Sequence, residues 1–201
     1  MRPTTAVITL LGLIAPWGGA SYAYVDVRAG KATGHAEVKE TSSSTKFAGT
    51  SADAGFGIVT GGPKTVCFVP HVNMQMLENK HDSDGGEKET LSLIGGGLRI
   101  DLGNTQTNKF SEAFLGLTSH IANVERTGDK EVKQRYTGYG IEGGLTLKLP
   151  LGPFEPLLGY HGFYHQFTGG KRTDENASVD QELFGFSLTG YMLLAGLRIG
   201  F

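Results

Sequence analysis

The side chains best suited to chemistry are six histidines, 20 Asp and Glu residues and one cysteine, in a chain of 201 residues. A histidine oriented by a carboxylate can act as general base for a nearby serine nucleophile. A Glu142–His161 pair fits half of that arrangement, but no serine stands two residues from His161 or His165. Ser119 and His120 are adjacent, so on a strand they point to opposite faces. We therefore predict no catalytic site.

Metal and cofactor sites are not indicated either. His35, His71 and His81 show no metal-ligand spacing, and the acidic stretch Lys80–Glu87 matches a calcium loop too loosely to predict one. We expect no metal and no cofactor. Cys67 has no second cysteine for a disulfide, and we interpret it as a small buried packing residue.

Charged side chains alternate with apolar ones, which is typical of strands with two unlike faces. The charged face carries Asp26, Arg28, Asp53, Arg99, Asp101, Glu112, His120, Glu142, Lys148, Glu155, His161, His165 and Arg198. Both signs are mixed along it, and an unpaired buried charge is costly. We interpret this set as a structural ion-pair network, with a proton or ion path, or a gate, as the alternative.

Eight alternating segments must position these side chains. We predict strands over Tyr24–Val38, Ser51–Thr60, Thr65–Leu77, Thr90–Leu102, Lys109–Val124, Arg135–Leu149, Phe154–Phe167 and Leu183–Phe201. Long polar connections (Lys39–Thr50, Glu78–Glu89, Glu125–Gln134 and Thr168–Glu182) alternate with short ones (Gly61–Lys64, Gly103–Asn108 and Pro150–Pro153). This rhythm is typical of an up-and-down barrel with long loops at one end. Pro70 removes a ladder donor and predicts a bulge.

The hairpin around Leu151-Gly152 predicts its own register. If these two residues form the turn, Leu, Tyr and Phe side chains oppose one another on one face. The other face then pairs Lys148 with Glu155 and Glu142 with His161.

The two faces also predict the surroundings of the barrel. The charged face is punctuated with glycine, as a narrow interior requires, and the apolar face carries bulky side chains, as a lipid-facing surface does. The segments reach the ~9–11 residues of a membrane-spanning strand, and no stretch approaches the ~20 apolar residues of a spanning helix. In lipid a sheet must close, because hydrocarbon offers no hydrogen bonds. A soluble lipocalin-like barrel, with the apolar face inside, is the rival interpretation.

Residues 1–23 have the features of a signal peptide. Arg2 supplies the positive charge, Ala6–Ile14 the apolar run, and Ser21-Tyr22-Ala23 a cleavage site, with cleavage after Ala20 as the alternative. Residues 24–201 then form the barrel domain. The formal net charge of −2 gives no basic field for nucleic acid.

The C-terminal residues 194–201 resemble the assembly signal of bacterial outer-membrane barrels. Gly196, Ile199 and Phe201 match that signal, whereas Leu194 stands where a polar residue is usual. With the leader and the strand rhythm, the chain resembles the small eight-stranded outer-membrane β-barrels of Gram-negative bacteria, the OmpA-barrel, OmpX/Ail and OmpW-like group. The resemblance implies an all-β, antiparallel transmembrane barrel in the outer membrane, with both termini in the periplasm. It also implies contact with outer-membrane lipid and lipopolysaccharide, periplasmic chaperones and the barrel assembly machinery.

For function, we expect a non-enzymatic barrel with a polar interior filled by side chains and four surface loops. Such a barrel would serve envelope integrity, or surface interaction and adhesion through its loops. Passage of small or hydrophobic solutes through a narrow pore, or modification of lipid A by a barrel enzyme, are the alternatives.

Overall fold

A computed structural model describes residues 22–38, 43–59, 66–80, 88–102, 110–127, 132–174, 177–183 and 185–201. These residues form antiparallel strands β1 (Tyr22–Val38), β2 (Ser43–Val59), β3 (Val66–Lys80), β4 (Lys88–Leu102), β5 (Ser111–Thr127), β6 (Val132–Lys148), β7 (Phe154–Asp174), β8 (Ala177–Leu183) and β9 (Phe186–Gly200). In this part of the chain no helix is long and apolar enough to cross a membrane. The expected signal peptide falls almost entirely on residues 1–21, outside the described residues.

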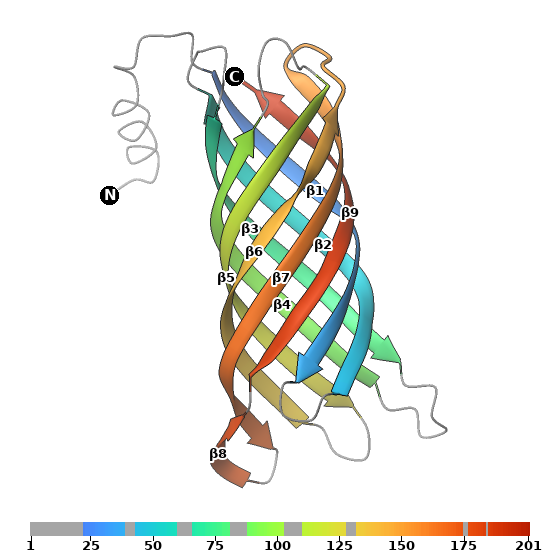
Figure 1. Cartoon of the computed structure of the whole chain (residues 1–201), viewed down its shortest axis with the longest axis vertical. Coiled ribbons are helices and arrows are strands. Elements are labelled where there is room, and N and C mark those ends of the chain that lie inside the picture. The colour runs from blue at the N-terminus through green and yellow to red at the C-terminus, as the bar shows by residue number, and fades with distance from the viewer. Residues whose placement is uncertain are drawn as a thin grey trace, which may run out of the picture.

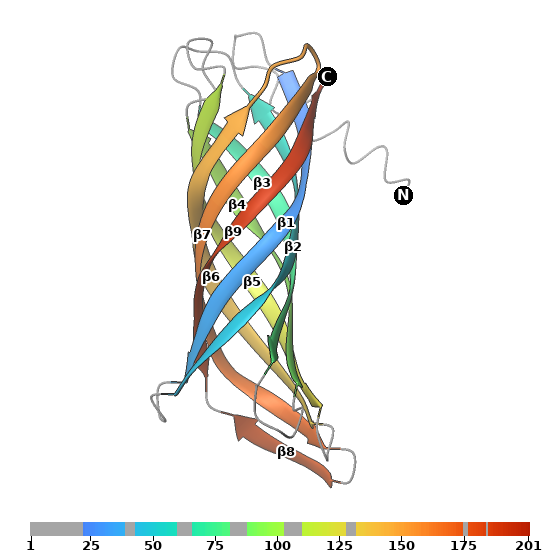
Figure 2. The same ribbon diagram turned by 90° about the vertical axis from the view of Figure 1, so that its right-hand side faces the viewer.

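Eight of the nine strands close into a barrel (Figures 1 and 2). Each strand from β1 to β7 pairs with the next, β7 pairs with β9, and β9 pairs with β1. The short β8 pairs with β7 outside this ring. The predicted closed, all-antiparallel, eight-stranded barrel is confirmed.

The two ends of the barrel differ. The turn end, at the top in Figure 1, holds the β6–β7 turn and Phe201, whose backbone exchanges hydrogen bonds of 3.1 and 2.9 Å with Ala23. The loop end, at the bottom, is where β1 leads to β2, β3 to β4 and β5 to β6, and where the β7–β8 hairpin projects.

Side chains alternate between lumen and exterior along each barrel strand. In β5, Glu112, Phe114, Thr118 and His120 are buried, whereas Leu115 and Leu117 are more than half exposed. Exposed Leu, Ile, Val and Phe on the outer face of a closed barrel form a belt suited to lipid. Along β6 and the residue that follows it, the belt runs from Tyr139 to Leu149. At ~3.3 Å per residue and ~40° tilt this length spans ~25 Å, the height of a membrane barrel's apolar band.

Aromatic side chains mark both edges of this belt. Tyr139, Tyr164 and Tyr191 are exposed toward the loop end, and Tyr160 stacks on Tyr191 with ring centroids 5.8 Å apart. At the turn end the exposed rings are those of Phe68, Phe110, Phe154 and Phe201. Aromatic rings are enriched where the lipid-facing surface of a membrane barrel meets the interface with water, and the amphipathic ring of tyrosine suits that position. The exterior therefore carries an apolar belt with an aromatic edge at each end.

The β6–β7 register differs by two residues from the predicted one. Leu151 pairs with Phe154, so Gly152 and Pro153 form the turn. Gly152 has φ +70°, which a type II′ turn needs at its first central position, and proline suits the negative φ of the second. Lys148 consequently opposes Leu157, and the predicted pairing of Lys148 with Glu155 is wrong.

The predicted pairing of Glu142 with His161 is wrong for the same reason. Glu142 opposes Phe163, and His161 opposes Gly144. A slip of two residues keeps every side chain on its face, because strand side chains alternate with period two. The predicted faces therefore hold although the predicted pairs do not.

The strands also run further toward the loop end than predicted. β2 begins at Ser43, eight residues before the predicted start, and β7 continues to Asp174 and folds back as β8. The predicted loops Lys39–Thr50 and Thr168–Glu182 are therefore largely strand. Their polar composition reflects a ladder that extends into water beyond the belt.

Pro70 lies on the exterior and does not produce the predicted bulge. The β2–β3 register is the same on both sides of it, at Gly55↔His71 and Ile58↔Phe68. A proline whose ring faces lipid leaves the ladder locally unpaired without inserting a residue.

Candidate functional site

An ion-pair network fills the turn half of the lumen. Arg99 binds three carboxylates: its Nε lies 2.7 Å from Asp101, and its two terminal nitrogens lie 3.1 Å from Asp53 and 2.8 Å from Asp26. Arg198 makes two bonds to Glu112, at 2.9 and 2.6 Å. Two parallel bonds between a guanidinium and a carboxylate are the strongest form of this contact.

Asp26 is the centre of the network. Its Oδ2 atom lies 2.7 Å from Arg28, 2.8 Å from Arg99 and 3.1 Å from Arg198. Lys148 completes the set through Glu112, at 3.3 Å. Four cations (Arg28, Arg99, Arg198 and Lys148) thus meet four carboxylates (Asp26, Asp53, Asp101 and Glu112), all buried. Equal numbers of opposite charges are what a dry interior requires.

Glu155 takes a marginal place in this network. Its side chain is 22% exposed and lies 3.8 Å from Arg198. It stands at the turn end, close to the β6–β7 turn, where water competes for the charge.

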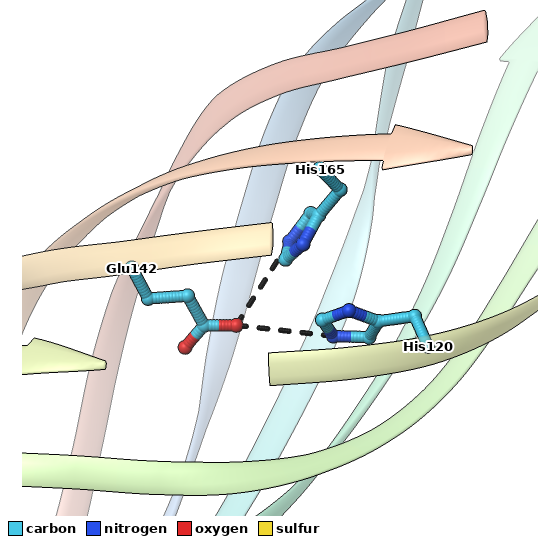
Figure 3. A group of neighbouring side chains, drawn as sticks. All are labelled: His120, Glu142 and His165. Atoms are coloured by element: carbon cyan, nitrogen blue, oxygen red, sulfur yellow. Dashed lines mark ion pairs between the residues drawn. The ribbon is translucent and has the colours of Figure 1, made fainter. Parts of the chain in front are cut away.

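A second cluster of polar side chains lies nearer the middle of the lumen. His120, Glu142 and His165 come from β5, β6 and β7 and point toward one another (Figure 3). Both Nε2 atoms lie 3.9 Å from Glu142 Oε1. Asn73 Nδ2 donates to the same oxygen at 2.6 Å, and Asn73 Oδ1 lies 3.0 Å from His120 Nε2.

Glycines opposite the two histidines make room for their rings. Gly95 faces His120 across the β4–β5 ladder, and Gly140 faces His165 across the β6–β7 ladder. A Cβ atom at either glycine would overlap the imidazole. Each ring can therefore lie against the neighbouring strand and reach toward the lumen axis.

His161 belongs to neither the predicted pair nor this cluster. Its Nε2 lies 3.1 Å from Arg28, and its ring packs edge-on against Phe114 at 4.3 Å. It connects the ion-pair network to the wall of the barrel.

The loop half of the lumen is apolar. Its buried side chains are Ala32, Phe47, Leu77, Leu91, Leu93, Ala122, Val124, Tyr136, Phe163, Phe167, Phe186, Leu188, Met192 and Leu194. The expectation of a polar interior is therefore correct for one half and wrong for the other. These side chains alternate in phase with the charged ones, so the face was predicted but the change of polarity along it was not.

A pocket opens at the loop end of the barrel, between this apolar core and the outside. It has a volume of about 170 Å³, and its walls include Val38, Phe47, Leu91, Val124 and Phe186. Polar residues stand at its rim: Arg126 lies 3.2 Å from Glu89, and Tyr136 donates to Gln134 at 2.9 Å. The pocket suits a small solute with an apolar body and a polar end.

Known structures share this architecture. Neisserial surface protein A is 18% identical over 90% of this chain and 98% of its own, with a TM-score of 0.51. A major outer membrane protein of Thermus thermophilus is 12% identical over 90% and 100%, with a TM-score of 0.64. Ail of Yersinia pestis is 10% identical over 88% and 99%, with a TM-score of 0.56. The sequence matches no family model and no curated protein.

This chain has the fold of the small eight-stranded outer-membrane β-barrels. The exposed apolar belt with its aromatic edges agrees with that fold, since such a surface is stable in a bilayer and not in water. The fold and the exterior surface are together those of an integral barrel of the bacterial outer membrane.

The residues that resemble the assembly signal of outer-membrane barrels lie on β9 and just after it. Ile199 and Phe201 face the exterior, with Phe201 69% exposed. Gly196 faces the lumen, where a Cβ atom would overlap the backbone of Val27. Recognition of these residues by the assembly machinery stays a prediction.

Sequence reasoning missed several lumen residues of this outer-membrane barrel. Tyr24 donates to Asp101 at 2.8 Å. The Arg198 guanidinium lies over the Tyr24 ring, with its Cζ atom 3.9 Å from the ring centroid. His71 bonds Asp53 at 2.9 Å, and Asn73 bridges the middle cluster. The alternation along the strand could have identified two of them. His71 and Asn73 stand an even number of residues from Cys67, whose buried position was predicted, so they face the lumen as well.

Proposed function

We propose that this protein is a non-conducting barrel that acts through its loop end, facing the outside of the cell, in contact with external surfaces. The observation that carries the proposal is the filled lumen. The three arginines of the network are 1% exposed, and Leu77, Leu93, Leu188 and Leu194 of the apolar half are 0% exposed. A lumen filled by such side chains offers no continuous path for water or ions.

The extended loop end supports a role outside the membrane. β7 has 21 residues, against the ~9–11 that a spanning strand needs, and its hairpin with β8 projects beyond the barrel. Ail, of similar fold, is described as an attachment invasion locus protein and was solved with a heparin analogue.

Exposed cations next to the belt support contact with lipopolysaccharide. Lys31, Lys46 and Arg135 lie on the exterior face toward the loop end. Anionic phosphates of the outer leaflet are the ligands that such side chains attract.

We also propose that the protein is not an enzyme. A barrel that modifies lipid needs its reactive groups where an acyl chain can reach them. His71, His120, His161 and His165 are at most 5% exposed and lie inside the lumen, away from the lipid-facing surface.

Planar bilayer recording tests the first part of the proposal. The refolded full-length protein should give no channels, and steady single-channel conductance would overturn it.

A binding assay tests the second part of the proposal. Cells displaying the protein should bind a heparin-coated surface more than cells displaying a variant with residues 171–183 replaced by a short turn. Equal binding by the wild type and a folded variant would contradict a role in surface contact and favour a role in envelope integrity. That role is measured as the dye permeability of a strain that lacks the protein.

The pocket at the loop end carries a second candidate function, the binding of a small apolar solute. Its volume of about 170 Å³ is below the ~300–1,000 Å³ of sites for drug-sized ligands. Calorimetric titration with octanoate should show binding to the wild type and none to Val124→Arg, which fills the pocket. Equal heats from both proteins would exclude this function.

A further inference from the structure

Glu142 differs from the other buried carboxylates in its surroundings. The carboxylates of the network each lie within 3.1 Å of an arginine nitrogen: Asp26, Asp53, Asp101 and Glu112. Glu142 is 3% exposed, and within the described residues its ion-pair partners are His120 and His165. A buried carboxylate that keeps its negative charge needs a compensating positive charge beside it. Among the described residues, no Lys or Arg forms an ion pair with Glu142.

His165 provides an independent observation. Its side chain is 0% exposed, and neither ring nitrogen has a hydrogen-bond partner among the described residues. Its Nε2 points toward Glu142 (Figure 3), and its ring packs against Phe163 at 4.9 Å and His120 at 4.1 Å. Buried polar atoms without a partner are rare in proteins and commonly mark a bound ion, a water or a functional group.

We propose that His120, Glu142 and His165 bind a divalent first-row transition-metal ion, for which Zn²⁺ is the best match. Their ligand atoms lie within 4.8 Å of one another. Two imidazole nitrogens and a carboxylate oxygen are a donor set that Zn²⁺ uses, with water in the fourth position. Bonds of ~2.0–2.2 Å to one ion would bring these atoms to roughly 3.3 Å apart, a movement of about an ångström for each side chain.

Asn73 acts as the outer-shell partner of this site. It donates to Glu142 at 2.6 Å and lies 3.0 Å from His120 Nε2, so before metal binding it keeps both side chains beside the same point. On metal binding His120 exchanges this contact for the ion, while Asn73 keeps its bond to Glu142. The ion then joins β5, β6 and β7 in the middle of the lumen. This role is structural and independent of the proposed surface contact.

Metal analysis of the refolded full-length protein tests the proposal. After exposure to Zn²⁺ and gel filtration in metal-free buffer, the wild type should retain one ion per chain, and Co²⁺ should give visible d–d absorption. Glu142→Gln, a neutral variant of the same shape, and His165→Gln should each reduce the affinity for Zn²⁺. The reduction should exceed the ~10–100-fold loss that is typical of changes to outer-shell residues. Zn²⁺ should also raise the unfolding midpoint of the wild type and not of Glu142→Gln.

Matched controls separate this site from other histidines. His161→Gln removes a lumen imidazole outside the set and should retain the ion, as should a His35→Gln/His81→Gln double variant. Altered migration of unheated samples on a gel identifies the folded variants. The proposal is overturned if the folded wild type retains no stoichiometric metal. It is also overturned if Glu142→Gln binds as tightly as the wild type, which would mean that Glu142 is a protonated, hydrogen-bonded carboxyl group.

Discussion

At the scale of single residues, Asp26 links the arginines of the lumen network to one another. Its Oδ2 atom contacts arginines from β1, β4 and β9. Removing one arginine leaves carboxylates that cannot regain water, so the loss exceeds the value of one contact. An exposed ion pair has no such penalty, because water replaces the missing partner.

Arg99→Met should therefore destabilise the barrel by ~3–5 kcal/mol, since Asp26, Asp53 and Asp101 each lose a buried cationic partner. Arg126→Met is the matched control: its side chain is 56% exposed and pairs with Glu89, so its loss should be at most ~1 kcal/mol. Equilibrium unfolding in urea from lipid vesicles measures both. Equal losses would mean that the lumen is hydrated and the network is screened by water.

At the scale of elements, the β6–β7 hairpin shows how a turn sets a register. Gly152 and Pro153 place Leu145 opposite Tyr160, whereas a turn at Leu151-Gly152 would place it opposite Leu158. Both alternatives keep the same face toward lipid. The turn residues therefore decide the pairing that the hydrophobic pattern leaves open.

Cysteine cross-linking distinguishes these registers. In a Cys67→Ala background, Leu145→Cys/Tyr160→Cys should oxidise to a disulfide readily, because opposed Cα atoms lie ~5.5 Å apart. Leu145→Cys/Leu158→Cys is a diagonal pair with ~7–8 Å between its residues and should oxidise poorly. The reverse order of yields, read by mass spectrometry, would restore the register predicted from the sequence.

The first strand leads to a prediction about the leader. Ala23 exchanges two backbone hydrogen bonds with Phe201, and the β1–β2 ladder begins at Tyr22. Cleavage after Ala20 keeps these residues in the barrel, whereas cleavage after Ala23 removes both bonds. We expect the mature N-terminus at Ser21, as measured by mass spectrometry of the outer-membrane protein. A mature chain that begins at Tyr24 would contradict this expectation.

At the scale of the whole molecule, the barrel is apolar outside and, in its turn half, charged inside. This inversion follows from the lipid around the barrel, because exposed Leu and Ile side chains are stable in contact with hydrocarbon. The sheet must close because hydrocarbon offers its backbone no hydrogen bonds. The belt has two edges, so the same substitution should have different effects at different heights.

Leu145→Arg should cost ~2–4 kcal/mol, because it places a charge on the lipid face near the middle of the belt. Thr189→Arg is the control on the exterior of β9, at the aromatic edge opposite Tyr164, where ~0–1 kcal/mol is expected. Refolding yield and urea unfolding in vesicles measure the difference. A harmless Leu145→Arg would favour the soluble barrel with its faces reversed.

The sequence by itself determined which face each side chain takes. Asp26, Arg28 and Arg198 alternate with Val25, Val27 and Leu197, and this period of two is a local property that survives any even change of register. The number of spanning strands and the closure of the sheet followed from the same pattern, because lipid allows no unpaired edge.

Tertiary structure alone decided which lumen residues meet. Lys148 contacts Glu112 rather than Glu155, and His120, Glu142 and His165 converge from three strands. Such contacts depend on the stagger of each strand against the next and on curvature around the barrel, which sum over all eight strands. No single segment encodes that sum, and this is the physical reason why the ion-pair partners and the candidate metal site could not be predicted from the sequence.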